Sequence, residues 1–196
     1  MKILIISSPR AGSTVLTEVL GKIFNLKKYH EPFNKHWGSH YKKNYEFSKN
    51  CIVKVMAYEK EINTNKTSVE FLSEFSKQFD TVILLDRLDY QKQLESYTFM
   101  RQIRYDGNWQ SSYVFDDDVD LLREDYYLTL QKENIKLISK EIKSEILFYE
   151  NIYSNNREKI FEEFKKVNIS LPENILDTLL NTKYKLRRES IDESLI

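Results

Sequence analysis

Short apolar runs alternate along the chain with longer stretches in which apolar residues recur every three or four positions. The short runs fit buried strands, and the longer stretches fit helices that lie against a sheet. The predicted strands are 2–6, about 26–30, 51–56, 81–85 and 145–149. The predicted helices are 13–24, 66–78, 89–104, 118–142, 156–166 and 172–181. This alternation is typical of an α/β fold, in which helices cover a parallel sheet.

The polar segment at 34–50 follows neither period and is expected to be a long loop with aromatic and cationic side chains. Candidate caps support two of the predicted helices, with Ser8 or Ser13 before the first and Thr67 or Ser68 before the second. No internal repeat, low-complexity segment or interdomain linker interrupts the pattern. Residues 1–196 are therefore expected to form a single domain.

The composition is that of a folded globule, with 41% hydrophobic residues among 196. The 30 Lys and Arg balance the 30 Asp and Glu, so net charge does not indicate a nucleic acid or an anionic membrane as partner. The single cysteine, Cys51, excludes an internal disulfide and fits a reducing compartment. No leader precedes the first strand, and no apolar run approaches the roughly 18 residues of a membrane span. We expect a soluble, cytoplasmic protein, and the sequence carries no signal for its oligomeric state.

The junction between the first strand and the first helix has the chemistry of an anion site. Apolar residues 3–6 lead directly into Ser7-Ser8-Pro9-Arg10-Ala11-Gly12-Ser13-Thr14. A strand, a tight loop and a helix start aim backbone N–H groups and a helix dipole at one point, which suits a phosphate or a sulfate. Gly12 permits close approach of the backbone, while Arg10, Ser13 and Thr14 supply side-chain donors. The alternative is an ordinary strand-to-helix turn of an α/β domain.

This loop differs from a nucleotide-binding P-loop in the position of its cation. ATP- and GTP-binding loops end in Gly-Lys-Ser/Thr, where the lysine reaches the β- and γ-phosphates and the hydroxyl holds Mg²⁺. The corresponding residues here are Gly12, Ser13 and Thr14, and the cation lies upstream at Arg10. A P-loop kinase would need that lysine and an acidic Mg²⁺ ligand, for which Asp86 is the one candidate. A kinase is therefore the second hypothesis.

A second candidate site follows the fourth predicted strand. Arg87 would lie at the carboxyl end of that strand, the edge at which open α/β sheets bind ligands. Ser96 would lie about two turns into the next helix. An arginine and a serine placed in this way can converge on one phosphate. The alternative is that Arg87 pairs with Asp86 or Asp89 and that Ser96 lies on a helix surface.

Both sites, in this order, resemble those of the sulfotransferases that use 3′-phosphoadenosine 5′-phosphosulfate (PAPS). The phosphosulfate loop of that family reads roughly Pro-Arg/Lys-Ser-Gly-Ser/Thr-Thr, against residues 9–14 here. Its 3′-phosphate site pairs an arginine with a later serine, against Arg87 and Ser96. The trehalose-sulfotransferase-like group is the most similar subtype. Its Arg-Arg-Asp-x-x-Arg-Gln-x-x-Ser stretch is followed by Gly-x-Trp, against Gly107-Asn108-Trp109 here.

Shorter fragments extend the resemblance over most of the chain. Residues 53–56 are similar to the Val-Lys-Leu segment of the third strand in that family, and residues 147–152 to its Tyr-Glu-Asp-Leu. Ala11, Leu88 and Asn151 stand where the family has Ser, a second Arg and Asp. The resemblance implies a three-layer sandwich like that of P-loop-containing nucleoside triphosphate hydrolases, with a central parallel sheet of about five strands. It also implies the residues that bind PAPS: Arg10, Ala11, Gly12, Ser13, Thr14, Arg87 and Ser96.

Sulfuryl transfer needs a group that takes the proton of the acceptor hydroxyl, and Glu31 is the candidate base. It follows the second predicted strand, where the similar carbohydrate sulfotransferases have Glu-Pro and the trehalose-type enzymes have a catalytic Glu. His30 is the alternative base, because its ordinary pKa is closer to neutral pH. Strand alternation points only one of these two residues at the cofactor. The alternative for Glu31 is a solvated loop carboxylate or a helix cap.

Two cations complete the expected catalytic set. Arg10 would stabilise the charge that develops on the leaving group, and Lys54 would contact the transferring sulfuryl group. A strand-end lysine that extends to solvent explains Lys54 almost equally well. The basic tail at 182–190 would close over the cofactor, with a frayed terminus as the alternative.

The resemblance implies an enzyme that transfers a sulfuryl group from PAPS to a hydroxyl of a carbohydrate-like or small-molecule acceptor by in-line displacement. No metal is expected to take part, because the aspartates at 116–120 fit a solvated helix start better than a cation site. A third hypothesis is a non-catalytic nucleotide-binding protein of the same fold. Which acceptor is used is not encoded in any motif of the chain.

Overall fold

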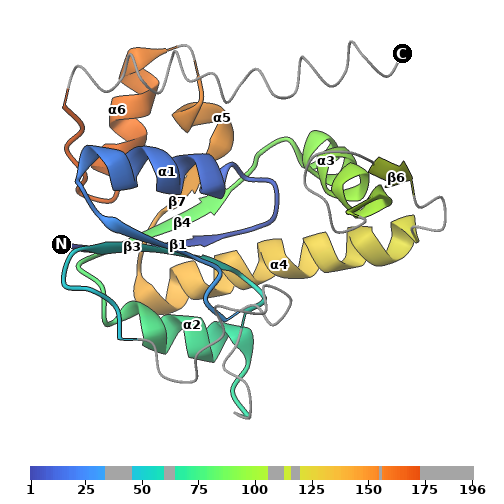
Figure 1. The fold of residues 1–196 in the computed structure, drawn as a ribbon, viewed down its shortest axis with the longest axis horizontal. Coiled ribbons are helices and arrows are strands. Elements are labelled where there is room, and N and C mark those ends of the chain that lie inside the picture. The colour runs from blue at the N-terminus through green and yellow to red at the C-terminus, as the bar shows by residue number, and fades with distance from the viewer. Residues whose placement is uncertain (34–45, 60–64, 106–112, 116–119, 155, 173–196) are drawn as a thin grey trace.

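The computed structural model contains a central sheet of five parallel strands in the order β2-β3-β1-β4-β7 (Figure 1). The structure describes residues 1–33, 46–59, 65–105, 113–115, 120–154 and 156–172. The strands of the central sheet are β1 (Lys2–Ser7), β2 (Lys27–His30), β3 (Cys51–Met56), β4 (Thr81–Asp86) and β7 (Ile146–Phe148).

Helices cover both faces of this sheet (Figure 1). On one face lie α1 (Ser13–Ile23), α5 (Tyr149–Ile152) and α6 (Arg157–Lys165), and on the other lie α2 (Ser68–Ser76) and α4 (Leu121–Ile142). Beyond the carboxyl ends of the strands, α3 (Tyr90–Gln102) is followed by an antiparallel pair, β5 (Ile103–Tyr105) and β6 (Tyr113–Phe115). Among the described helices, none is both long and apolar enough to cross a membrane.

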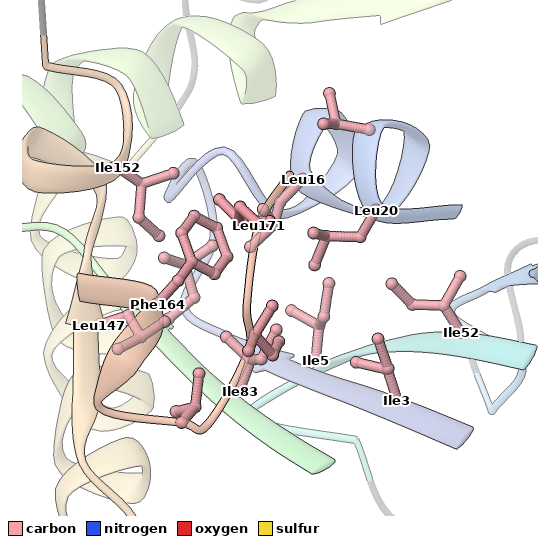
Figure 2. Packing of buried hydrophobic residues seen from close by; sticks show 14 of the residues in the cluster. Ile3, Ile5, Leu16, Leu20, Ile52, Ile83, Leu147, Ile152, Phe164 and Leu171 are labelled. Atoms are coloured by element: carbon pink, nitrogen blue, oxygen red, sulfur yellow. The ribbon is translucent and has the colours of Figure 1, made fainter. Parts of the chain in front are cut away.

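Alternate residues of the central strands supply two separate cores. Ile3 and Ile5 of β1 face α1 and α6 and pack among Leu16, Leu20 and Phe164 (Figure 2). Leu4, Ile6 and their neighbours face α2 and α4 on the other side. Because β1 is buried on both faces, it reads as a continuous apolar run in the sequence.

The connections of β1 and β4 leave the sheet in opposite directions. The chain passes from β1 through α1 to the edge strand β2, whereas it passes from β4 through α3 and α4 to β7 on the other edge. Since β1 and β4 are neighbours, their carboxyl ends mark the point at which the strand order reverses. Ligands of open α/β sheets bind at such a point.

The structure confirms the five predicted strands of the parallel sheet, each to within about two residues. It corrects the last one, since Tyr149 already begins α5. The predicted helix at 172–181 lies outside the described residues, apart from Pro172 at its start. The β5–β6 pair was not predicted, because strands of three residues are too short to show a period.

The helix caps were predicted with mixed success. Thr67 caps α2 as predicted, in a reciprocal capping box with Glu70. The prediction of Ser8 or Ser13 as the cap of α1 was wrong: the capping position is Gly12, and no side chain caps this helix end. Ser8 is instead bound in the interior beneath the loop, and Ser13 is already the first helical residue.

Candidate functional site

The loop between β1 and α1 has the backbone shape that an anion site needs. Arg10 and Gly12 both have left-handed backbone conformations, with φ of 60° and 79°. Gly12 stands at the start of α1, and it offers no side-chain cap to the N–H groups of the first turn. The positive end of the α1 dipole therefore faces the carboxyl edge of the sheet.

A buried polar network supports this loop from below. The Ser8 hydroxyl donates to Asp86 Oδ1 at 2.6 Å, and the Gln93 amide donates to Ser8 Oγ at 2.7 Å. Lys132 of α4 donates to Asp86 Oδ1 at 2.9 Å and to Gln93 Oε1 at 3.0 Å. Residues of β4, α3 and α4 thus meet under the first loop. Such a fully connected network holds the loop in one position.

Two tyrosines of the α5 segment clamp the loop from the side. The Tyr153 hydroxyl donates to the Gly12 carbonyl at 2.8 Å. A Cβ atom added to Gly12 would lie 2.7 Å from Tyr153 Cε2 and 2.8 Å from Tyr149 Cδ2. Glycine is therefore required at position 12 by close packing as well as by its backbone conformation. Burial raises the pKa of Tyr153, so its hydroxyl stays a neutral donor.

A direct hydrogen bond joins the two predicted cofactor motifs. Arg10 Nε donates to Ser96 Oγ at 2.9 Å, across 86 positions of sequence. Arg10 is exposed, whereas Ser96 is 6% exposed on the inner side of α3. This contact brings the first loop and α3 together, whereas the predicted convergence of Arg87 and Ser96 on one phosphate stays a prediction. The surface position considered for Ser96 is wrong.

Arg87 is buried at the carboxyl end of β4 and lies against Tyr149, the ring that also packs against Gly12. Its Nε lies 3.4 Å from Glu150 Oε1, and its guanidinium carbon lies 4.8 Å from the ring centroid of Tyr149. The ion pair with Glu150 lacks hydrogen-bond geometry, so the buried Nε has no hydrogen-bond acceptor among the described residues. Asp86 and Asp89, considered as partners from the sequence, form ion pairs with Lys132 and Lys92 instead.

Glu31 and Lys54 form a nearly buried ion pair beside α1. Lys54 Nζ lies 2.5 Å from Glu31 Oε1 and donates to the Thr14 hydroxyl at 3.2 Å. The side chains are 7% and 15% exposed for Lys54 and Glu31. This excludes a solvated carboxylate at position 31 and a lysine that extends to solvent at position 54. Glu31 has a left-handed backbone, with φ of 46°, and its N–H donates to the Lys54 carbonyl.

His30, the alternative base, has a different neighbour. Its Nε2 lies 3.0 Å from Glu18 Oε1 on α1. Burial and, next, the charge of Lys54 lower the pKa of His30, while Glu18 opposes this shift. Of the two candidates, Glu31 is the one in contact with Lys54 and, through it, with the Thr14 hydroxyl of the predicted cofactor loop.

The seven residues predicted to bind the cofactor thus lie at one edge of the sheet, together with Glu31 and Lys54. The loop, Arg87 and Ser96 surround the reversal point between β1 and β4. The Lys54–Glu31 pair lies beside them, at the carboxyl ends of β3 and β2. Three cationic groups next to a helix N-terminus can hold a ligand with several negative charges. A carboxylate within reach of them can accept a proton.

Other predicted features fall outside the described residues. These are the aromatic loop apart from its last residues, the Gly107-Asn108-Trp109 segment, the aspartates at 116–118 and the basic tail. Asp120 is described, and its carboxylate caps α4. Among the described residues, no group of three or more His, Cys, Asp or Glu side chains is arranged to hold a metal ion.

The sequence did not reveal the groups that hold the site together. Lys132 is one of several lysines along a polar helix, and nothing in the local pattern distinguishes it. Tyr149 and Glu150 belong to a fragment noted for its resemblance, but the role of Glu150 as the partner of Arg87 depends on the pairing of β7 with β4. Tyr153 lies one helical turn after Tyr149 and directly follows that fragment, and this spacing is the signal that could have found it.

With this geometry established, we compared the chain with known proteins. No protein-family model matches it, and the search of curated proteins found no similar sequence.

Proposed function

We propose that this protein transfers a sulfuryl group from PAPS to a hydroxyl of a carbohydrate-like or small-molecule acceptor. The proposal also takes the α/β sheet to be the core of a P-loop-like sandwich. The observation that carries it is the Arg10–Ser96 hydrogen bond. It supports the proposal because PAPS presents two separate anionic groups, and this hydrogen bond joins the loop expected to hold one of them to the helix that follows Arg87 and is expected to hold the other.

The donors suit a molecule with a phosphosulfate at one end and a 3′-phosphate near the other. The uncapped start of α1 and Arg10 would hold the phosphosulfate, with Ser13 and Thr14 as hydroxyl donors. Arg87 and Ser96 would hold the 3′-phosphate. The buried Arg87 Nε has no hydrogen-bond acceptor among the described residues, which fits an anion partner supplied by a ligand. PAPS supplies the activated sulfuryl group.

Glu31 is the proposed general base. It accepts the proton from the acceptor hydroxyl. The resulting oxygen nucleophile attacks the sulfur of the sulfuryl group, in line with the bond to the leaving phosphate oxygen. Lys54 holds the Glu31 carboxylate and the Thr14 hydroxyl together, so that the base and the cofactor loop keep a fixed separation. Arg10 and the N–H groups of the loop stabilise the negative charge that develops on the leaving phosphate oxygen.

The kinase alternative has less support from the geometry. Ser13 stands where a P-loop kinase has its lysine, and Asp86 is the candidate Mg²⁺ ligand. Asp86 Oδ1 already accepts from Ser8 and from Lys132, and the carboxylate is 4% exposed. A non-catalytic binding protein would differ from the proposal only in turnover, since it would use the same anion-binding residues.

Calorimetric titration of the purified protein with PAP (3′,5′-bisphosphoadenosine), ADP and GTP, each with and without Mg²⁺, tests the proposal directly. We expect tightest binding of PAP and no effect of Mg²⁺, because Arg87 and Ser96 address the 3′-phosphate that ADP and GTP lack. Preference for ADP or GTP with Mg²⁺ would contradict the proposal and support a kinase. Binding of PAP without sulfuryl transfer to a panel of hydroxyl acceptors would support the non-catalytic alternative.

The substitution Arg10→Ala is expected to weaken PAP binding by roughly ten- to a hundredfold, the loss of one charge-assisted contact. Arg157→Ala is the matched control, because Arg157 is an exposed arginine at the start of α6. The dissociation constants of both variants come from the same titration. Unchanged PAP affinity in Arg10→Ala would reject the assignment of the loop.

A further inference from the structure

Glu59 lies just after β3, at the same edge of the sheet as the proposed site. The turn that contains it is fixed by Ala57, whose N–H donates to the Ser7 carbonyl at the end of β1 and whose carbonyl accepts from Asn134 of α4. The Glu59 N–H donates to the Met56 carbonyl, which closes the turn. The side chain points inward, and the residue is 3% exposed.

The carboxyl of Glu59 is unusual for a buried acid. Neither of its oxygens has a hydrogen-bond partner of good geometry in the part of the chain that the structure describes, although the backbone of Met56 and Phe33 lies close enough to favour the ionised form slightly. The charged groups that act on it are the carboxylate of Glu31 and the ammonium of Lys54. Buried carboxylates without partners are costly, and such groups in native proteins call for an explanation.

The charges of this cluster explain the state of Glu59. Among the described residues, Lys54 is bonded to Glu31 at 2.5 Å, and its charge reaches the buried Glu59 carboxyl without an ion pair to it. A second ionised carboxylate would be buried beside the first without a cation of its own. Burial, followed by the charge of Glu31, raises the pKa of Glu59 to about 8, although Lys54 and the nearby backbone of Met56 and Phe33 oppose the shift. At neutral pH Glu59 therefore carries a proton.

We propose that Glu59 is a positioning residue of the Glu31 site, which stays neutral so that Lys54 remains the partner of Glu31. Loss of the Glu59 proton would place a second negative charge beside Glu31 and draw Lys54 away from it. The arrangement that joins Glu31 to Thr14 would then change at alkaline pH. The catalytic meaning of this arrangement rests on the proposed function, but the electrostatic coupling between Glu59, Glu31 and Lys54 does not.

The coupling is measured by ¹³C NMR of protein labelled at the glutamate side-chain carboxyl, titrated from acid to alkaline pH. We expect one resonance with a midpoint near 8, absent in Glu59→Gln. The midpoint should fall by about one pH unit in Glu31→Gln, which removes the neighbouring negative charge, and rise in Lys54→Met. Glu145→Gln, an exposed glutamate before β7, should leave it unchanged. An ordinary acidic midpoint for Glu59, or one that is insensitive to Glu31→Gln, would overturn the proposal.

The functional consequence is tested by the pH profile of kcat for sulfuryl transfer. The wild type should lose activity as Glu59 ionises, whereas Glu59→Gln, which keeps a neutral side chain of similar shape, should retain its activity at alkaline pH. A purely structural role would change stability and leave the two profiles parallel, which would overturn the positioning role. If the protein transfers no sulfuryl group, the proposed function fails, and the carboxyl titration alone still decides whether Glu59 is coupled to Glu31.

Discussion

Arg10 and Glu31 share a backbone feature that is uncommon outside glycine. Both have positive φ, as do three other non-glycine residues, Asn25, Lys143 and Asn168. Asparagine tolerates this conformation, and Lys143 stands at the C-terminal end of α4, a position at which left-handed residues are common. Arg10 and Glu31 have neither reason, and each such residue costs on the order of 1–3 kcal/mol. The contacts to Ser96 and Lys54 hold these two residues in their strained conformations.

At the residue scale, Glu31→Gln separates binding from catalysis. The amide keeps the shape of the side chain but cannot take up the acceptor proton, so turnover should fall by about 10²–10⁴-fold. PAP affinity should remain close to that of the wild type, because Glu31 contacts the loop only through Lys54. Both quantities are measured on the same preparation, by sulfuryl transfer and by calorimetry.

His30→Asn is the comparison variant for this experiment, since His30 is the neighbouring candidate base. If His30→Asn abolishes turnover while Glu31→Gln remains active, the base has been assigned to the wrong residue. Loss of PAP binding in Glu31→Gln would show instead that the Lys54–Glu31 pair holds the loop in place.

At the scale of elements, α4 connects the core to the site. It begins at Leu121, where the Asp120 carboxylate caps the first turn, and it runs 22 residues along one face of the sheet. Its buried residues Ile135 and Ile138 anchor it in the core below β1 and β4. The same helix then presents Lys132 to Asp86 and to the Arg87 carbonyl. The packing of α4 in the core thus fixes the position of Lys132 and, through Asp86, the position of the loop that lies above it.

The substitution Lys132→Met should therefore affect both stability and binding. It leaves the buried Asp86 carboxylate without its cation, which costs about 3 kcal/mol. PAP affinity should fall as well, because Lys132 no longer fixes Asp86 and Gln93, the two residues that bond to Ser8 beneath the loop. Urea unfolding and calorimetry measure the two effects.

Lys136→Met, one turn further along α4 and exposed, is the control and should be close to neutral in both measurements. Equal stabilities of the two variants would show that the Lys132 network contributes little. A stability loss without a change in PAP affinity would confine the network to a structural role.

At the scale of the whole molecule, burial of ionisable groups makes stability depend on pH in a specific direction. The folded protein keeps the Glu59 proton up to about pH 8, whereas the unfolded chain releases it near the ordinary glutamate pKa. The unfolded state therefore binds fewer protons between these values, and the free energy of unfolding falls as pH rises through this window. His30 acts oppositely, because its lowered pKa weakens the folded state below about pH 6.5.

Comparison of the wild type with Glu59→Gln isolates this contribution. The difference in unfolding free energy should grow from near zero at pH 4.5 to a few kcal/mol in favour of the variant at pH 8, in urea titrations at each pH. His30 is common to both proteins and cancels in the difference. A difference that does not change with pH would mean that Glu59 titrates normally in the folded protein.

The fold was largely predictable because its signals are local. The strands β1, β3 and β4 are buried runs of apolar residues, and the capping box of α2 lies within four consecutive residues. The convergence of the first loop with Ser96 was predictable only through the order of motifs and the rule that parallel strands end at one edge. The α1 cap was mispredicted because the local serine pattern competes with the buried contact between Ser8 and Asp86.

The sequence by itself determined the parallel α/β architecture, and it singled out the first loop as a candidate anion site with the candidate residues Arg10, Glu31 and Arg87. These features depend on periodicity and on residue chemistry within short windows. Only the tertiary structure decided which partners those residues have. Glu150 faces Arg87 and Lys54 faces Glu31 because β7 pairs with β4 and β2 with β3. Strand order follows from the packing of the whole chain, and no short window of sequence encodes it.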